Sequence, residues 1–223
     1  MNLPIDKILN LINECKTDNY SPIIAIDGHG GSGKSRLAKE LANKDSSISI
    51  IHFDDFYCSS FTKYKNDQNL PEFDWQRLEE EVLIPIRNDK DAKYQRYDWE
   101  LNRLNEWIEV VAGKIIIIEG VYSLTSKLQK YYDFKIWVDC PLEIRLNRAK
   151  ARDKEYMTNT MDLWLNNWIP RENNYVLSEK PYNYANLIID GSGQYGDIEL
   201  GELRTLDLNT IDSFQLKSNE DPD

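Results

Sequence analysis

The octapeptide Gly-His-Gly-Gly-Ser-Gly-Lys-Ser at residues 28–35 decides the fold class, because it matches the phosphate-loop pattern G-x-x-x-x-G-K-[ST]. It follows an apolar run at 22–26 that predicts a buried strand, and helix formers continue from it through 35–42. Glycines let backbone N–H groups close around phosphate oxygens, and the positive end of the helix adds attraction. An ordinary glycine-rich turn has no need of the Lys34-Ser35 pair, so the loop predicts nucleoside triphosphate binding.

The expected nucleotide contacts extend from the loop into the first turn of the helix. Lys34 is placed to bridge the β- and γ-phosphates, and the Ser35 hydroxyl to bind Mg²⁺. The full set of expected contacts is Gly28, His29, Gly30, Gly31, Ser32, Gly33, Lys34, Ser35 and Arg36. Of these we expect His29 to be a loop spacer rather than a catalyst, because the loop acts through its backbone.

Short apolar strands alternate with helical segments along the chain. Expected strands cover 22–26, 48–53, 114–118, 134–138 and 186–189, and 92–99 is expected to be an extended excursion. Expected helices cover 3–14, 35–42, 73–87, 141–152 and 160–178, the last on either side of Pro170. This alternation predicts an α/β fold, a three-layer P-loop NTPase sandwich with a central parallel sheet.

Composition narrows the functional class. The 223 residues suit one domain, and 27 Lys plus Arg against 38 Asp plus Glu give a net charge of −11, which counts against a nucleic-acid binder. The longest apolar run, 115–118, is too short to cross a membrane, and the first residues lack a signal-peptide pattern. Three widely spaced cysteines show no metal-binding spacing. We therefore expect a cytoplasmic protein with no membrane and no nucleic-acid partner.

Carboxylates and arginines follow the predicted strands. Asp54 and Asp55 follow the second strand, and Glu119 follows the third, where a ligand crevice opens in open α/β sheets. A turn or a solvated strand end would be the alternative. Arg145, Arg148 and Arg152 share one face of a predicted helix and suit a triphosphate, or else a surface network with Glu143 and Asp153.

Five segments resemble, in this order, the uridine kinase-like family of P-loop kinases, which also includes phosphoribulokinase, bacterial-type pantothenate kinase and nicotinamide riboside kinase. They are D-G-H-G-G-S-G-K-S (27–35), H-F-D-D-F-Y (52–57), Y-D-W (97–99), I-I-I-I-E-G-V-Y (115–122) and R-A-K-A-R-D (148–153). The resemblance implies ATP and Mg²⁺ as cofactors and transfer of the γ-phosphoryl group to a small-molecule hydroxyl, that of a nucleoside first of all. It also implies a kinase domain over 1–191 with a helical lid at about 145–175 and an acceptor-binding excursion at about 56–104. Residues 192–223 then form a polar acidic segment whose end is expected to be mobile.

The resemblance also assigns roles. The catalytic set is Asp54 as the acid that deprotonates the acceptor, Lys34, and the lid arginines Arg148 and Arg152. The metal set is Ser35, Asp54 and Glu119. Adjacent acids cannot be ranked from sequence, so Asp55 is the alternate for Asp54. The expected acceptor contacts are Asp55, Tyr57, Asp67, Tyr97, Asn102 and Arg103.

Two departures keep the acceptor open. Uridine kinases place a histidine shortly after the Y-D-[FW] segment, where this chain has Asn102, and their N-F-D-H-P-type segment is N-D-Q-N-L-P at 66–71. The alternatives are a nicotinamide-type riboside, a pantothenate-like alcohol or a sugar phosphate as acceptor, a nucleotide-regulated binding protein without turnover, or an NTPase coupled to a partner. Trp164 and Trp168 indicate core packing or a wall of the acceptor pocket. Family members are often oligomeric, which leaves a homo-oligomer open.

Overall fold

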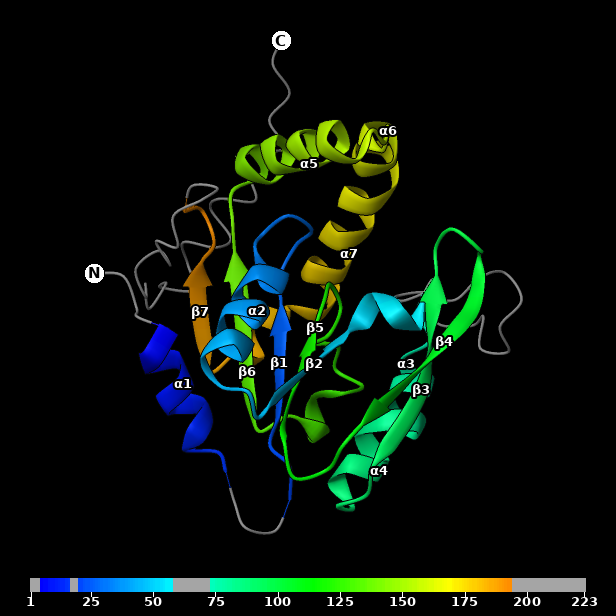
Figure 1. The fold of residues 1–223 in the computed structure, drawn as a ribbon. Helices are drawn as coiled ribbons and strands as arrows, with labels where there is room; N and C mark the ends of the chain where they lie inside the picture. The colour runs from blue at the N-terminus through cyan, green and yellow to red at the C-terminus, as the bar shows by residue number, and fades with distance from the viewer. Residues whose placement is uncertain (1–4, 17–19, 58–72, 194–223) are drawn as a thin grey trace.

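A computed structural model describes residues 5–16, 20–57 and 73–193. Its centre is a parallel sheet of five strands in the order β2-β5-β1-β6-β7 (Figure 1). The strands are β1 (Ile23–Asp27), β2 (Ile48–His52), β5 (Ile115–Glu119), β6 (Phe134–Asp139) and β7 (Leu187–Asp190). The predicted parallel sheet is confirmed. The second strand ends one residue earlier than expected, because Phe53 opens a short 3-10 helix, η1 (Phe53–Phe56).

Alternate residues of β5 face two separate cores. Ile115 and Ile117 pack in the cluster that contains α1 (Ile5–Asn13) and α2 (Lys34–Lys44). Ile116 and Ile118 pack on the opposite face, in the cluster that contains Tyr175 and Val176. All five residues of β5 are buried. This agrees with the run of four isoleucines, which predicts a strand covered on both faces.

Two of the helices contain a wide π turn before a proline. The helix predicted at 73–87 comprises α3 (Trp75–Leu78), a π turn (Glu79–Leu83) and α4 (Ile84–Arg87). The second comprises α6 (Met161–Leu163), a π turn (Trp164–Trp168) and α7 (Ile169–Glu179). A proline ring collides with the carbonyl four residues earlier in a regular helix, and in both cases that residue lies in the π turn. The helix therefore continues through Pro85 and through Pro170.

An antiparallel hairpin stands beside the sheet (Figure 1). Its strands are β3 (Ala92–Asp98) and β4 (Arg103–Val110). The extended excursion at 92–99 is confirmed, but the sequence reading missed β4, because most of its side chains are exposed and give little hydrophobic alternation. The remaining helices are α5 (Leu142–Tyr156), which runs four residues past the expected end, and the 3-10 turns η3 (Gln129–Tyr131) and η5 (Pro181–Tyr184).

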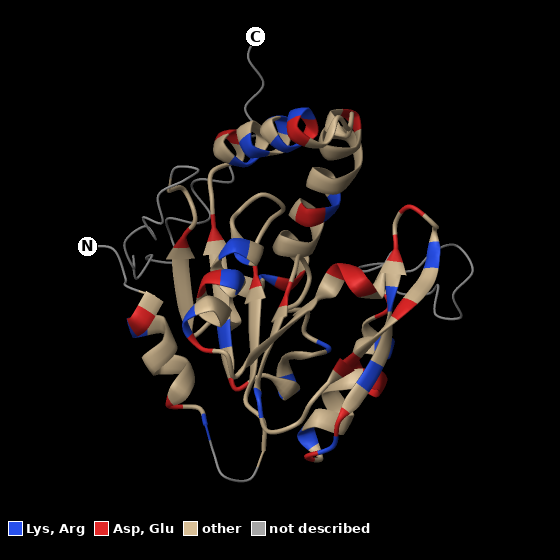
Figure 2. Cartoon of the chain, viewed as in Figure 1, with Lys and Arg blue, Asp and Glu red and all other residues tan. Residues whose placement is uncertain are grey.

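The carboxyl ends of the sheet strands meet under α5 and the upper part of α7 (Figure 1). Acidic residues end four of these strands, and α5 above them carries both signs of charge (Figure 2). They are Asp27, Glu119, Asp139 and Asp190. Within the described residues, no helix combines the length and apolar character needed to cross a bilayer. Asp67 and nearly all of the polar segment 192–223 lie outside the described residues.

Candidate active site at the phosphate loop

The loop at 28–35 joins β1 to α2 as its sequence predicts. Gly33 sits at the N-cap of α2 with φ 111°, a left-handed conformation that favours glycine. The Lys34 ammonium donates to the His29 carbonyl at 2.9 Å, so the lysine folds back over its own loop. This arrangement leaves the positive end of α2 directed at whatever the loop encloses.

A pocket of about 650 Å³ opens on one side of the loop. Residues of the loop and α2 line it together with Arg148, Arg152 and the segment after β7. Six expected nucleotide contacts belong to the lining: Gly31, Ser32, Gly33, Lys34, Ser35 and Arg36. This volume and lining suit the base, sugar and first phosphates of a nucleotide.

Gly28, His29 and Gly30 do not line this pocket, so their expected contact with the nucleotide stays a prediction. A Cβ on Gly28 would lie 2.2 Å from the Val138 carbonyl, so this residue presses against β6. The His29 ring is buried and meets Trp137 edge-on, with 5.7 Å between ring centroids. Burial, followed by the charges of Arg145 and Lys34, lowers the pKa of His29 to about 3. His29 is thus a neutral spacer under the loop.

Glu119 connects the loop to β2. The Ser35 hydroxyl donates to Glu119 Oε2 at 3.1 Å, and Glu119 Oε1 contacts His52 Nδ1. The parallel register pairs His52 directly with Glu119, which is why two strand ends bring these side chains together. The hydrogen bond to Glu119 is the main reason that the pKa of His52 is raised. Sequence reasoning missed His52; its position at the end of β2 was the available signal.

The donor set of Ser35 and Glu119 suits Mg²⁺. Both offer oxygen, which this hard cation prefers, and protein sites for Mg²⁺ commonly supply one or two carboxylates and leave the rest to phosphates and water. The described residues contain no cluster of three or more His, Cys, Asp or Glu side chains that could hold a metal without such help. The third expected ligand, Asp54, lies on the 3-10 turn that follows β2.

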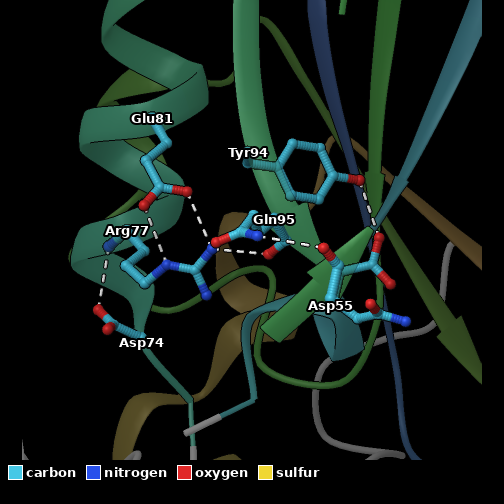
Figure 3. Close-up of polar contacts among 7 residues, drawn as sticks. Asp55, Asp74, Arg77, Glu81, Tyr94 and Gln95 are labelled. Carbon is cyan, nitrogen blue, oxygen red and sulfur yellow. Dashed lines mark hydrogen bonds and ion pairs between the residues drawn. The ribbon is translucent and has the colours of Figure 1, made fainter. Parts of the chain in front are cut away.

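The two adjacent aspartates point to different surroundings. Asp55 accepts a hydrogen bond from the Tyr94 hydroxyl of β3 at 2.8 Å, and Arg77 bonds the neighbouring Gln95 carbonyl (Figure 3). Asp54 is exposed to solvent on the same turn. The loss of bulk water raises the pKa of Asp54, and the negative charge of Glu119 adds to the effect. The geometry therefore separates two acids that the sequence could not rank.

Aromatic rings gather next to this turn. Tyr57 contacts Trp99, Tyr97 and Phe73, with ring centroids 4.4, 4.9 and 5.7 Å apart. The Tyr97 hydroxyl donates to the Asn102 side chain. Two expected acceptor contacts, Tyr57 and Tyr97, are thus in one group that we call the aromatic group (Tyr57, Phe73, Tyr97 and Trp99). Sequence reasoning did not select Trp99, which is 56% exposed.

Arg103, also expected at the acceptor, begins β4 and its side chain is exposed. It pairs with Asp98 in the hairpin register. Asn102 precedes it with φ 50°, because the chain turns there. The structure therefore joins Asn102 to the aromatic group through Tyr97 and leaves Arg103 outside it.

The three arginines of α5 have three different surroundings. The buried Arg145 lies 3.6 Å from Glu172. Arg152 stacks over Trp164 at 5.4 Å. Asp153, which the alternative interpretation placed in a surface network, accepts hydrogen bonds from Thr158 and Thr160 just after α5.

Arg148 braces the loop through backbone carbonyls. Its guanidinium donates to the carbonyls of Gly31 and Ser32 on one side, and to those of Gly191 and Gly193 on the other. Carbonyl oxygens satisfy the guanidinium here, so its expected role at the phosphates stays a prediction. What the geometry establishes is that Arg148 fixes the loop against the segment after β7.

Helix α7 contacts the beginning of the loop at two points that sequence reasoning missed. Glu172 accepts from the Gly30 amide at 3.0 Å, and the Tyr175 hydroxyl donates to Asp27 at 2.7 Å. Both residues are buried, and Tyr175 belongs to the core cluster that covers the sheet. The lower half of α7 is therefore part of the body of the domain, although the lid was expected to extend to about 175. Trp164 packs on Gly30 and belongs to a separate cluster with Ala149 and Ile169. Of the two roles considered for this ring, core packing and a wall of the acceptor pocket, the structure shows packing.

The sheet is parallel, a phosphate loop follows its first strand, and acidic residues lie at the ends of the neighbouring strands. These features together define a P-loop kinase of the α/β class. A family model described as "Phosphoribulokinase / Uridine kinase family" matches residues 23–194. The chain belongs to this family, as the resemblance predicted.

Relatives agree with this assignment. The chain is 31% identical over 182 residues to a uridine kinase from Clostridium botulinum (strain Langeland / NCTC 10281 / Type F), which covers 77% of this chain and 88% of that protein. It is 29% identical over 198 residues to a uridine kinase from Lactobacillus helveticus (strain DPC 4571). This match covers 82% of this chain and 92% of that protein. The family and these relatives indicate a small-molecule kinase.

Solved structures share the fold. One is described as a possible uridine kinase from Bacillus stearothermophilus, with a TM-score of 0.63, 21% identity, and 82% of this chain and 96% of that chain covered. Another is a D-glycerate 3-kinase from Cryptococcus neoformans, with a TM-score of 0.62 and 13% identity. The match covers 90% of this chain and 100% of that chain. At these identities the likeness is one of fold.

Replacing Arg148 tests its bracing role. We expect Arg148→Lys to lower the free energy of unfolding by about 2 kcal/mol, because a single ammonium cannot reach carbonyls on both sides. Urea denaturation measures this change. The control Lys150→Gln, at an exposed position on the same helix, should change stability by less than about 0.5 kcal/mol. Equal effects of the two substitutions would contradict the assignment.

The two histidines predict opposite dependences of stability on pH. The unfolded chain protonates His29 below about pH 6.5, whereas the folded protein does so only near pH 3, so acidification through this window destabilises the fold. His29→Gln should therefore gain stability relative to the parent as pH falls from 6.5 to 4, by about 1.4 kcal/mol per unit at the steepest.

His52 is the matched control, since Glu119 raises its pKa in the folded state. The stability that this contact adds is fully present below the pKa of His52 in the unfolded chain. It is lost as the pH rises through the pKa of His52 in the folded protein. His52→Gln should consequently lose stability relative to the parent on acidification. Denaturation midpoints at several pH values distinguish the two signs, and a shift of the same sign in both variants would refute the assignments.

Proposed function

We propose that the chain is an ATP- and Mg²⁺-dependent kinase that transfers the γ-phosphoryl group to a hydroxyl of a nucleoside of the uridine or cytidine kind. The observation that carries this proposal is the position of Asp54, whose carboxyl feels the charges of Glu119 and Lys34 and whose carbonyl accepts from the amide of Tyr57 in the aromatic group. A phosphate donor, a proton acceptor and a surface for a planar ring thus adjoin each other.

The loop and the adjacent pocket take ATP. Loop amides and Lys34 hold the β- and γ-phosphates, while the base and sugar enter the pocket between α2 and the segment after β7. Arg152 lines the same pocket, stacks on Trp164 and supplies positive charge close to the phosphates. Closure of α5 and α6 over this site would keep out the water that hydrolyses ATP.

Ser35, Asp54 and Glu119 would hold Mg²⁺. When bound, the ion neutralises charge on the β- and γ-phosphates. His52 contacts the oxygen of Glu119 that does not face Ser35, and so it fixes the rotamer of this carboxylate. The two contacts orient Glu119 for binding the ion.

Asp54 is the residue that accepts the proton of the acceptor hydroxyl. Its raised pKa makes it a stronger base than an ordinary aspartate. Asp55, by contrast, is engaged by Tyr94 and holds η1 against β3. We assign Asp54 as the base and Asp55 as its support.

The aromatic group favours a nucleoside as acceptor. Trp99 is 56% exposed and packs on the half-buried Tyr57, so these two rings offer a surface on which a nucleobase can stack, while Tyr97 is buried against both. Tyr97 orients the Asn102 amide, which can read a carbonyl oxygen at the rim of the base. Relatives at about 30% identity carry the name uridine kinase, which supports the same class.

The test is ADP release from Mg-ATP in the presence of nucleosides, nicotinamide riboside, pantothenate and sugar phosphates. We expect a pyrimidine nucleoside to stimulate release most. Stimulation by one of the other compounds would name a different acceptor. Tight ATP binding with no stimulation by any compound would favour a nucleotide-regulated binding protein.

Substitution of the two aspartates tests the base. Asp54→Asn should lower kcat by about 10²–10⁴-fold, the range that general bases contribute, with little change in KM for ATP. The matched variant Asp55→Asn keeps an acceptor for the Tyr94 hydroxyl and should lower kcat far less. A normal turnover rate in Asp54→Asn would overturn the assignment.

A further inference from the structure

Glu172 is a buried carboxylate seated on the phosphate loop. Its Oε2 accepts from the Gly30 amide at 3.0 Å and lies 3.6 Å from Arg145 Nη1. Glu172 is 5% exposed and Arg145 is 4% exposed, so this pair is removed from solvent. Within the described residues, Nη1 of Arg145 has no hydrogen-bond partner. Loop amides, arginine and lysine are the groups with which proteins bind phosphate, and here a side chain of the protein itself uses them.

The contact depends on a glycine. A Cβ on Gly30 would lie 2.8 Å from Glu172 Oε1 and 2.9 Å from the Trp164 ring. Only a residue without a side chain lets the carboxylate and the indole approach the loop this closely. The local geometry thus brings α7 and the π turn that contains Trp164 directly onto the loop.

Glu172 contacts the first half of the loop, at Gly30. It does not line the pocket that suits the base and sugar. The groups whose charges act on its carboxyl are Lys34, Arg145 and Asp54, and Asp54 is the proposed base. The carboxylate is therefore placed where the last phosphate of a triphosphate must come to face the acceptor. A terminal phosphoryl group and a buried carboxylate cannot share this position, because both are negative and both need the same donors.

We propose that Glu172 is an internal anion that occupies the terminal-phosphate end of the loop in the nucleotide-free protein, and that a nucleoside triphosphate displaces it whereas a diphosphate does not. The inference rests on the proposed function, since it takes the loop to bind ATP. It makes Glu172 a residue that distinguishes substrate from product nucleotide. Displacement of Glu172 also breaks the contact between α7 and Gly30. In this way binding of the γ-phosphate would change the position of the helices above the site.

Equilibrium binding to Glu172→Gln tests the inference without any acceptor. The amide can still accept from Gly30 but has no charge to pair with Arg145, so it yields its position more readily. We expect the Kd of a non-hydrolysable Mg-ATP analogue to fall by about tenfold, because a larger fraction of loops is free to bind, and the Kd of Mg-ADP to change less than about twofold. Calorimetry measures both.

Glu179→Gln is the matched control. Glu179 lies on the same helix and accepts from Thr125 and Ser126, away from the loop. Both dissociation constants should stay at the parent values. A parallel change for the two nucleotides in Glu172→Gln would mean that Glu172 merely braces the loop, and no change would mean that it is not displaced; either result overturns the inference. Failure of both nucleotides to bind the unaltered protein would instead overturn the proposed function, and the inference with it.

A second measurement needs no change at Glu172. Trp164 packs on Gly30, so displacement of the carboxylate should alter its surroundings. The ATP analogue should change the tryptophan emission of the unaltered protein more than ADP does, since ADP can act on Trp164 only through Arg152 of the pocket, and Trp164→Phe should abolish the difference. The same emission change with both nucleotides would contradict the inference.

Discussion

The carboxylate of Asp27 ties together the three segments on which the site depends. It accepts from the Gly28 amide at 2.6 Å, from the Leu124 amide at 2.8 Å and from the Tyr175 hydroxyl at 2.7 Å. The residue is completely buried, which raises the pKa of Asp27 to about 6, and the three hydrogen bonds offset part of this cost. The start of the loop, the turn after β5 and helix α7 thus meet at one point.

The parallel register brings together the residues of both halves of the proposed site. β5 lies between β1 and β2, so Glu119 stands between the loop that takes the donor and the turn that carries Asp54. Gly120 allows this spacing, because a Cβ there would lie 2.6 Å from that of Phe53, at the beginning of the same turn. The hairpin β3–β4 then holds that turn from the other side through Tyr94. The residues proposed to take the donor, the metal and the acceptor are thus positioned by adjacent strand ends rather than by long loops.

The sequence predicted those parts of the site that local patterns encode. The phosphate loop, all five strands of the sheet and the acids at the ends of β2 and β5 follow from short motifs and hydrophobic runs. The strand β4 escaped notice because its mostly exposed side chains leave little pattern to read. The helical spacing of Arg148 predicts a side chain aimed at phosphates, whereas two of its four carbonyl partners, Gly31 and Ser32, lie over a hundred residues away in the chain.

The parts of the site that the sequence did not predict depend on contacts between segments far apart in the chain. His52 meets Glu119 across 67 residues, and Glu172 meets Gly30 across 142. Neither pair has a spacing that a single sequence reveals, because only the sheet register and the path of α7 bring them together. The same holds for Tyr175 and Asp27, on which the loop depends.

The most direct test of this account is a crystal structure with Mg²⁺ and a non-hydrolysable ATP analogue. The account predicts the base in the pocket between α2 and the segment after β7, the metal at Ser35 and Glu119, and the terminal phosphate facing Asp54. A nucleotide bound with its terminal phosphate directed away from Asp54, or with the metal remote from Glu119, would contradict the claim that this loop places a phosphoryl donor against an acceptor site.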